Sequence, residues 1–440
     1  MISLSDLDSR PRRATACGCL LLVGLTLGAA VSAQANDTEA SDDPNKPAKK
    51  PSKSGYEKPD QISSASAVGT QLIDDDAVKK PWIPFSVVHQ GYYDVKRRLK
   101  TTTGIELSID YNFLNQYASV SDNGDRRGAS GGLRFFGRWY PPWVKEQPNG
   151  SLVFRFENRH TIASQTPKEL GFATGSSLST AGFKAFGWGT TALYWAQHSD
   201  DERLAFVAGQ MDPGDFEDIH PLLNPWTAFM NDASFNNPST ALPNQGLGLV
   251  VRGFVTDHLY LKGGLHDANG EPTRISFDSF FNVQEYFTWA EIGWAPTPAR
   301  EAAGESIHLL AWHSDRRVEA QVPEGWGLAF SASREIRDTW VPFLRAGYSE
   351  GDAANLSAMV SAGAGVRVRT DDLFGAALTW ARPPESEQGR DQFTLETFYR
   401  FQLTQHLQVT PGFFWHVKPS YNPAEDTVWV ASAIRIRFVL

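Results

Sequence analysis

Charged side chains that could bind a solute recur at alternate positions of several segments of this 440-residue chain. Arg155, Glu157 and Arg159 are spaced two residues apart, and Arg134 lies in a segment with the same alternation. Successive side chains of a β-strand point to opposite faces, so this spacing puts the three charges on one face of a strand. Arginine and carboxylate groups hydrogen-bond hydroxyl-rich or charged solutes and set selectivity in pores. The alternative is that paired charges only keep a wet interior solvated.

A second group lies in the irregular stretch from Asp212 to Gln245, which contains five prolines. Connections of this length are usually functional or poorly ordered. If the strands enclose a lumen, we expect this stretch to fold into it and form a narrow eyelet with the arginines, with Trp226 as a stacking surface for the ring of a solute. The alternative is an external loop that packs on its neighbours. The full candidate site comprises Arg134, Arg155, Glu157, Arg159, Asp212, Asp215, Glu217, Asp218, Trp226, Glu396 and Arg400.

Signatures of catalysis are few. The sequence has no Gly-x-x-x-x-Gly-Lys phosphate loop and no His-Glu-x-x-His metal motif. His308 and His313 are five residues apart, which puts them on opposite faces of a strand, so they would not share a metal ion. We therefore expect no enzyme, no cofactor and no metal site. A Ser/His pair assembled from distant strands is the alternative.

The last segment, residues 427–440, indicates which kind of element positions these charges. In steps of two, Val428, Val430, Ile434, Ile436, Phe438 and Leu440 fall on one face, and the other face carries Arg435 and Arg437. An apolar face against lipid and an arginine face against water would explain the pattern. Strands in lipid cannot leave their edges unpaired, so the sheet must close. The alternative is the edge strand of a soluble β-domain.

Similar alternation recurs along the chain from residue 104 onward. It predicts an all-β fold, a transmembrane antiparallel β-barrel of about sixteen strands, with a long in-folded or capping loop near 212–245. Fourteen or eighteen strands would also fit. The mean hydropathy of −0.34 suits strands that average to a polar-looking sequence. The 14 Trp, 12 Tyr and 27 Phe could supply interfacial girdles.

The N-terminal region differs in composition from the rest. Arginines 10, 12 and 13 precede an apolar run and a small-residue site ending at Ala33, which predicts a signal peptide over residues 1–33 rather than a membrane anchor. Both cysteines, Cys17 and Cys19, lie in it, so we expect an exported protein without disulfides. Residues 34–83 are polar and predict a disordered periplasmic linker. Residues 81–103 are expected to be a plug-like or capping segment, and residues 84–440 the barrel domain.

Several motifs in this order resemble the carbohydrate-selective porins of the OprB type. They are Gly209–Asp212, Phe229–Pro238, Tyr260–Asn269 and, most fully, Glu396–Pro411 with the closing strand. The resemblance covers residues 84–440 and implies a sixteen-stranded outer-membrane barrel that passes sugars such as glucose by facilitated diffusion. It also implies outer-membrane lipid and the barrel-assembly machinery as partners, and a monomer or a trimer. The chain departs from the family at Gly91–Asp94, where Trp-Gly-Gly is expected, and at its final Leu440.

The expected function is therefore sugar-selective passive transport, with both termini of the chain in the periplasm. A general or anion-preferring porin is an alternative in the same fold. A secreted β-rich carbohydrate-binding protein is an alternative from another class. The net charge of −9, with no basic domain, argues against a nucleic-acid partner.

Overall fold

A computed structural model describes residues 61–86, 88, 90–144, 149–297 and 305–440. These residues belong to one compact unit, Lys53–Leu440. The predicted signal peptide and the first part of the predicted linker, residues 34–60, lie outside the described residues.

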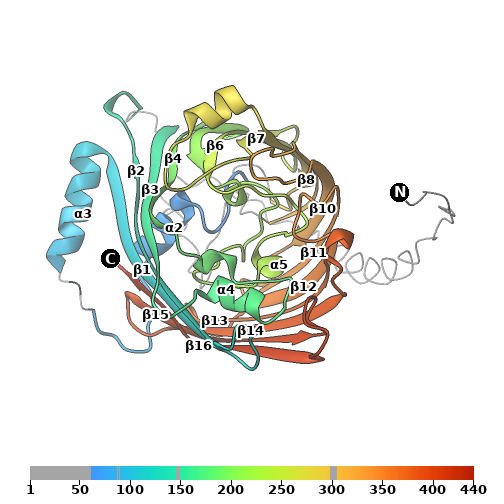
Figure 1. The fold of residues 1–440 in the computed structure, drawn as a ribbon. Helices are drawn as coiled ribbons and strands as arrows, with labels where there is room; N and C mark the ends of the chain where they lie inside the picture. The colour runs from blue at the N-terminus through green and yellow to red at the C-terminus, as the bar shows by residue number, and fades with distance from the viewer. Residues whose placement is uncertain (1–60, 87, 89, 145–148, 298–304) are drawn as a thin grey trace. The chain divides into compact units, whose positions relative to one another are not determined.

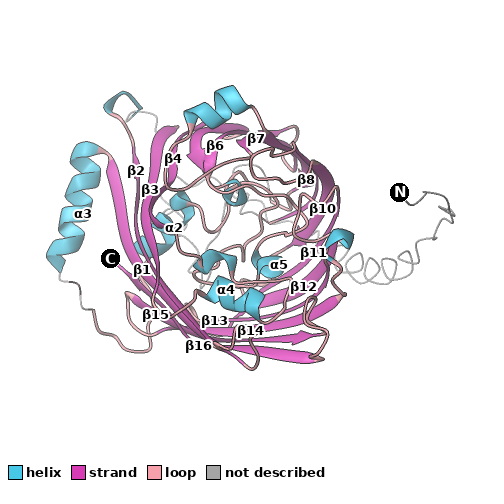
Figure 2. Ribbon diagram, viewed as in Figure 1, coloured by secondary structure: helices cyan, strands magenta, loops and turns pink. Residues whose placement is uncertain are grey.

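Within the described ranges, sixteen antiparallel strands form a closed barrel, in which each strand pairs with its neighbours in sequence and β1 pairs with β16 (Figures 1 and 2). The prediction of the fold class is confirmed. The strands are β1 (Ile105–Ala118), β2 (Arg127–Trp139), β3 (Gly150–Thr161), β4 (Gly187–His198), β5 (Leu204–Met211), β6 (Gly246–Phe254), β7 (Leu259–Asp267), β8 (Tyr286–Trp294), β9 (Ser306–Ser314), β10 (Gly325–Ser333), β11 (Trp340–Glu350), β12 (Ala358–Arg367), β13 (Leu373–Arg382), β14 (Gln392–Gln402), β15 (Leu407–Val417) and β16 (Thr427–Val439).

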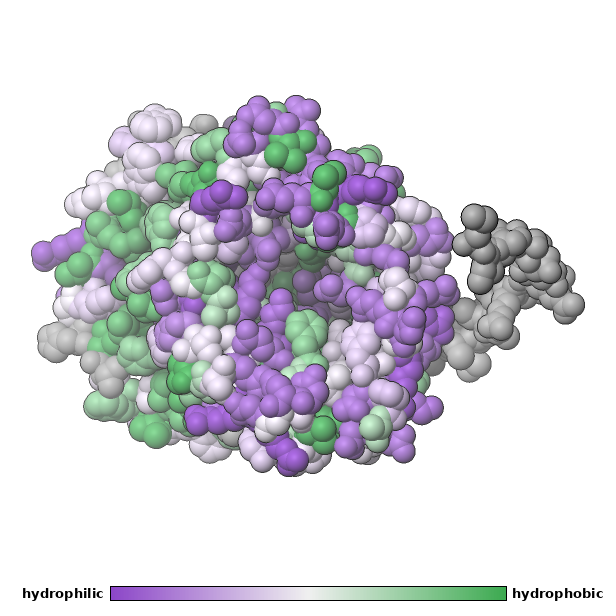
Figure 3. Space-filling model, in the orientation of Figure 1, coloured by the Kyte–Doolittle hydropathy of each residue, from purple (hydrophilic) through white to green (hydrophobic). Residues whose placement is uncertain are grey.

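The alternation of each strand divides its side chains between the outside and the lumen. In β8, Phe287, Trp289 and Glu291 are buried, whereas Ile292 and Trp294 are exposed on the outer face. Figure 3 shows hydrophobic residues along the visible outer wall and hydrophilic residues around the open end of the barrel. An outer face of this kind suits lipid. No helix among the residues described here is long and apolar enough to cross a membrane.

The last strand changes face along its length. Ser432 pairs with Gln116 whereas Ile434 pairs with Asn115, so β16 has an extra residue at this point. A β-bulge of this kind reverses the in–out alternation on either side of it. Val428 and Val430 are consequently buried in the lumen, where the strict alternation had put them outside, and Arg435 and Arg437 keep their predicted inward position.

The connections differ between the two ends of the barrel. The turn end carries short connections such as 199–203, 255–258 and 403–406, and the loop end carries long ones such as 162–186, 212–245 and 268–285. Helix α4 (Pro167–Ala173) begins with a capping box of Thr166 and Glu169 in one of the long loops, and α5 (Asp232–Phe235) lies in another. Single-turn helices occupy Pro142–Val144, Ala181–Phe183, Pro213–Asp215, Ser279–Val283 and Glu385–Glu387.

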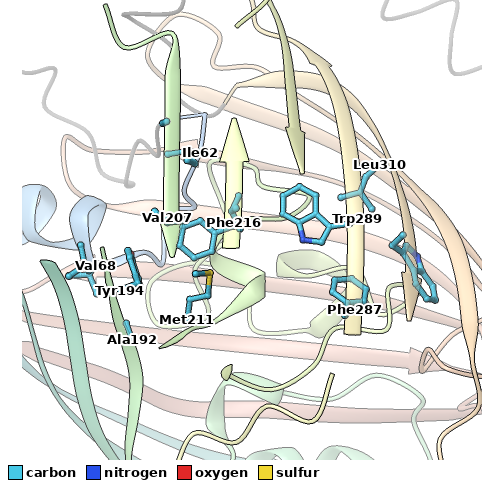
Figure 4. Packing of buried hydrophobic residues seen from close by; sticks show 14 of the residues in the cluster. Ile62, Val68, Ala192, Tyr194, Val207, Met211, Phe216, Phe287, Trp289 and Leu310 are labelled. Carbon is cyan, nitrogen blue, oxygen red and sulfur yellow. The ribbon is translucent and has the colours of Figure 1, made fainter. Parts of the chain in front are cut away.

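Residues 61–80, which we name the strap, run inside the barrel and contain helix α2 (Val68–Asp76) (Figure 1). This part of the predicted linker is ordered, and most of it is buried. Ile62, Val68 and Leu72 join an apolar cluster with wall residues that include Tyr194 and Val207 (Figure 4). Burying each such side chain stabilises the strap by roughly 1.5–3 kcal/mol relative to leaving it in water. The wall therefore supplies the apolar surface that the segment lacks by itself.

Helix α3 (Gln90–Thr103) lies outside the wall against β1 (Figure 1). Tyr93 Oη is 2.6 Å from His406 Nε2, and Lys100 pairs with Glu106 at 2.6 Å. The described residues between 81 and 103 do not form the expected plug or cap. The segment that lies inside the lumen is the strap, which precedes them in the sequence.

Candidate solute-binding constriction

The long connection from Asp212 to Gln245 folds into the lumen and is held there by the inner wall. Glu396 of β14 accepts hydrogen bonds from the backbone N–H groups of Met230, at 2.7 Å, and Asn231, at 3.2 Å. Arg400 donates to the carbonyl of Thr227 at 3.2 Å. The in-folded loop is confirmed, but Glu396 and Arg400 lie buried beneath it and hold its backbone, where the sequence had suggested that they line the pore.

Asp218 fixes the loop to the opposite part of the wall. Its carboxylate pairs with Arg345 of β11 and lies 2.9 Å from His308 Nε2 of β9, and all three side chains are buried. Burial opposes the ionisation of Asp218, but Arg345 and His308 together hold its pKa below the usual value. Asp218 was expected to face the arginines of β2 and β3. Its partners are instead Arg345 and His308, neither of which was among the candidate site residues.

Glu217 is buried next to Asp218 and faces the same part of the wall. Burial raises its pKa well above the usual value, and the negative charge of Asp218 adds to this effect. Arg345, Glu291 and Lys262 are the other charged groups that act on it. Glu217 therefore belongs to the packing behind the loop and does not reach the arginines of the predicted eyelet.

Asp215 does meet the arginine of the expected site. Arg155 of β3 lies 3.4 Å from the Asp215 carboxylate, donates to the carbonyl of Ser66 in the strap at 3.3 Å, and donates to Thr191 Oγ1 of β4 at 2.8 Å. Ser66 Oγ donates to Asp215 at 2.6 Å. Burial raises the pKa of Asp215, although Arg155 opposes the rise. The loop, the strap and the wall thus meet at one buried point around Arg155, Asp215 and Ser66, which we name the joint.

Glu157 and Arg159 flank this joint on β3. Arg159 donates two hydrogen bonds to the Glu157 carboxylate, at 2.8 and 3.0 Å, and a third to the carbonyl of Gly182 at 3.0 Å. Glu157 also lies 3.7 Å from Arg155. Because the carboxylate accepts from a planar arginine fork at two points, the orientation of Arg159 is fixed.

Arg134 of β2 pairs in register with Glu157 of β3 and belongs to a network that also holds the strap. It pairs with Asp110 of β1 and donates to Gln71 of α2 at 2.9 Å. Arg437 of β16 lies 2.9 Å from both Asp110 and Asp75. Asp110 and Asp75 were absent from the predicted site. Asp110 alternates with apolar residues in its strand, so its inward position could have been found from the sequence.

Trp226 lies at the edge of a polar cavity and is packed against neighbouring side chains. The Arg134 and Arg159 guanidinium carbons lie 4.6 and 5.0 Å from the centre of its ring, and the ring of Phe183 meets it edge-on at 4.9 Å. Only 4% of Trp226 is exposed. Its expected role as a stacking surface for sugar stays a prediction, in which a sugar would share the indole with two guanidinium groups and the ring of Phe183.

Two cavities lie on either side of the joint. The loop-end cavity has a volume of about 220 Å³ and is lined by polar side chains that include Arg155, Arg159, Lys184, Asp212 and Asp215. Asp212 also accepts a hydrogen bond from Gln245 at the end of the loop. The turn-end cavity has a volume of about 320 Å³, and Ser63, Arg138, Gln197 and Arg252 are among its lining residues.

Residues 128–132 match the Gly-x-Ser-x-Gly pattern of a nucleophile elbow. An elbow needs a sharp turn from a strand to a helix, whereas these residues lie within the regular part of β2. Ser130 Oγ donates to the carbonyl of Phe183 at 3.2 Å. The pattern therefore has no catalytic geometry.

Solved structures of OprB and of a porin are similar to this chain. The high-pH structure of Pseudomonas putida OprB is 13% identical, covers 83% of this chain and 99% of its own, and superposes with a TM-score of 0.62. The low-pH structure of the same protein is 11% identical, covers 83% and 100%, and has a TM-score of 0.48. A triple mutant of Rhodopseudomonas blastica porin is 11% identical, covers 76% and 100%, and has a TM-score of 0.43. No curated protein sequence matches the chain.

The sequence matches the carbohydrate-selective porin, OprB family, over residues 173–440. This region includes strands β4 to β16 and the loop that forms the constriction. The family and the fold are those of an outer-membrane channel for carbohydrate rather than of an enzyme. The chain belongs to the OprB family of carbohydrate-selective porins.

Proposed function

We propose that the protein lets neutral, hydroxyl-rich solutes of glucose-like size diffuse passively across the outer membrane into the periplasm. The observation that supports this most is the lining of the loop-end cavity, where four basic and three acidic side chains occur together. A neutral sugar that enters can exchange water for both donors and acceptors at little net cost. A charged solute would meet groups of its own sign.

The pairing of the arginines favours sugars over anions. Arg155 is engaged by Asp215, and Arg159 is engaged by Glu157. An anion would have to compete with these carboxylates for the same guanidinium groups. The arginine-rich inner face, which had suggested an anion-preferring pore, therefore supports a nearly neutral, hydrogen-bonding passage.

The orientation follows from the connections of the barrel. Barrels of bacterial outer membranes have short turns on the periplasmic side and long loops outside. We therefore place the turn end, helix α3 and the C-terminus in the periplasm, together with the linker that precedes the strap. Lipid then contacts the exposed outer faces of the strands, and the barrel-assembly machinery inserts them.

Liposome swelling tests this function with a small panel of solutes. We expect glucose to enter faster than gluconate, which has a similar size and a negative charge, and faster than a disaccharide. Empty liposomes and liposomes with heat-denatured protein are the controls. Faster entry of gluconate than of glucose would contradict the proposal in favour of an anion pore.

Ion selectivity should change with pH, because two groups of the loop-end cavity titrate near neutrality. Burial, together with the positive charges of Arg159 and Lys168, lowers the pKa of Lys184 to about 8. Burial raises the pKa of Asp232 to about 6, although Ser179 opposes the rise. Between about pH 5 and about pH 9, Asp232 therefore gains a negative charge and Lys184 then loses a positive one. Both steps make the cavity more negative, so the preference for cations should rise.

Reversal potentials in a KCl gradient measure this change. Lys184→Arg should remove the upper step, because arginine stays charged, and Asp232→Asn should remove the lower step. Asp212, which lines the same cavity, is unchanged in both variants. A selectivity that stays constant over this range in the wild type would show that ions do not pass these residues.

A further inference from the structure

The strap crosses the lumen between the two cavities. At its start, Gln61 donates to the carbonyl of Glu305 beside β9 at 2.9 Å, and at its end, Lys79 N donates to Gln405 beside β15 at 3.0 Å. Between these points it contacts β1, β2 and β3, which lie across the barrel from β9. Ser63 and Gly69 line the turn-end cavity, and Ser66 lines the loop-end cavity. A solute that moves from one cavity to the other therefore passes the strap.

The contacts of the strap indicate that it stays in place. Ser64 N donates to the carbonyl of Asp215 at 2.7 Å, and Asn224 of the loop donates to the carbonyl of Ala65 at 3.1 Å. Asp74 pairs with Lys79 at 2.7 Å and Asp75 pairs with Arg437 at 2.9 Å, with all four side chains buried. Removal of the strap from the lumen would expose Ile62, Val68 and Leu72 and would separate the Asp75–Arg437 pair.

We propose that the strap is a resident part of the channel and, together with Asp215 and Arg155, sets the largest solute that can pass. This inference rests on the proposed function as a sugar pore. The wall of a sixteen-stranded barrel encloses a wide lumen, so its bore depends on what fills it. Here the loop fills one part, and the strap fills the space that the loop leaves in front of β1, β2 and β3.

The chemistry of the strap suits a polar, uncharged solute. Where it meets the loop, it presents the hydroxyl groups of Ser64 and Ser66 beside the Arg155 guanidinium. Further along the strap, in α2, the side-chain oxygen of Gln71 accepts a hydrogen bond from Arg134. Ser64 and Gln71 are buried and bonded within the protein, so Ser66 and Arg155, which line the loop-end cavity, are the groups that a sugar hydroxyl can reach. The three aspartates of α2 pair with Lys79, with Arg437 of the wall and with Lys96 of α3, so they do not add a net charge to the passage.

Deletion of residues 61–80 tests the inference and leaves the barrel able to form. β1 pairs along its length with β2 and β16 without the strap, and Arg134 and Arg437 still share Asp110. A heat-modifiable band on a gel verifies that the variant is folded. We expect its single-channel conductance to rise severalfold and disaccharides to enter liposomes almost as fast as glucose. The matched control deletes residues 34–53, a segment of the same length, and should conduct as the wild type does.

A disulfide lock distinguishes a resident strap from a removable one. Ser66 Oγ donates to the Asp215 carboxylate, and Ser64 N donates to the Asp215 carbonyl, so S66C with D215C places two thiols on neighbouring stretches of backbone, and loss of free thiol on oxidation verifies that they have joined. The sequence has no cysteine beyond Cys17 and Cys19 to compete with them. We expect the oxidised and reduced forms of the double variant to have the same conductance and size limit. The single variants S66C and D215C control for the oxidant and for the loss of the carboxylate.

Three other results would overturn the inference, each in a different way. A folded strap deletion with the conductance and size limit of the wild type would show that solutes do not pass the strap. Conductance that oxidation abolishes and reduction restores would show that the strap must leave for transport. A folded deletion that conducts no ions and admits no sugar would contradict the pore function itself.

Discussion

Replacement of Asp218 by alanine is expected to free the in-folded loop, residues 212–245, from the wall and to lower the stability of the barrel. Asp218 pairs with Arg345 and His308 and accepts a 3.0 Å hydrogen bond from Asn237. Arg345 is fully buried, so the variant leaves an arginine in the wall without its counter-charge. Loss of one partner of a buried ion pair costs about 3–5 kcal/mol. The temperature at which the gel band shifts should fall, and the single-channel current should become larger and noisier.

Asp352→Ala is the matched control for this variant. Asp218 and Asp352 both have a left-handed backbone, with φ of 43° and 55°, so alanine meets a similar backbone strain at both positions. Asp352 is exposed in the connection between β11 and β12. An equal loss of stability in the two variants would show that the backbone, and not the ion pair with Arg345, explains the effect. Asp218→Asn, which keeps the shape of the side chain, should give an intermediate result.

The barrel could be predicted because each strand carries the pattern of side chains that drives its formation. A period of two, with apolar residues on one face and charges on the other, recurs often enough to count the strands and to place most inward arginines. The prediction failed in the first half of β16, where a bulge moves Val428 and Val430 into the lumen. A bulge depends on how two neighbouring strands pair. The alternation within β16 alone does not contain that information.

The strap could not be predicted from its own composition. Its few apolar residues, such as Ile62 and Val68, would not order a free chain. They are ordered because wall residues far away in the sequence, such as Tyr194 and Val207, provide an apolar surface inside the barrel. The composition of a segment indicates how much apolar surface it can bury within itself. It does not indicate which apolar surfaces distant parts of the chain provide.

The candidate site was predicted in part, for a related reason. Alternation tells which arginines point inward, but it does not tell how deep in the barrel each lies or which part of the loop reaches it. Asp215 meets Arg155 as expected, whereas Asp218 reaches Arg345 on the opposite wall. Trp226 was expected to stack on a sugar, and two of the same arginines lie against its ring. Pairings between a loop and a wall depend on the path of the loop.

Replacement of both Arg155 and Arg134 by alanine is expected to raise conductance severalfold and to weaken the block of current by sugar. Arg155 joins the strap, the loop and β4 through Ser66, Asp215 and Thr191. Arg134 holds α2 through Gln71 and is 0% exposed. Without the two guanidinium groups, the strap and the loop lose their shared anchor, and the space between the two cavities widens.

Single variants separate the size of the pore from its recognition of sugar. Arg155→Lys keeps the positive charge beside Asp215 and Glu157 but loses the planar fork that reaches three partners at once. We therefore expect it to restore most of the wild-type conductance and little of the sugar block. Arg367→Ala is the control, because Arg367 pairs with Glu335 near the turn end of β12 and lines neither cavity. If Arg155→Ala with Arg134→Ala matches the wild type in both conductance and sugar block, the two arginines only support a wide vestibule, and the narrowest passage lies elsewhere in the lumen.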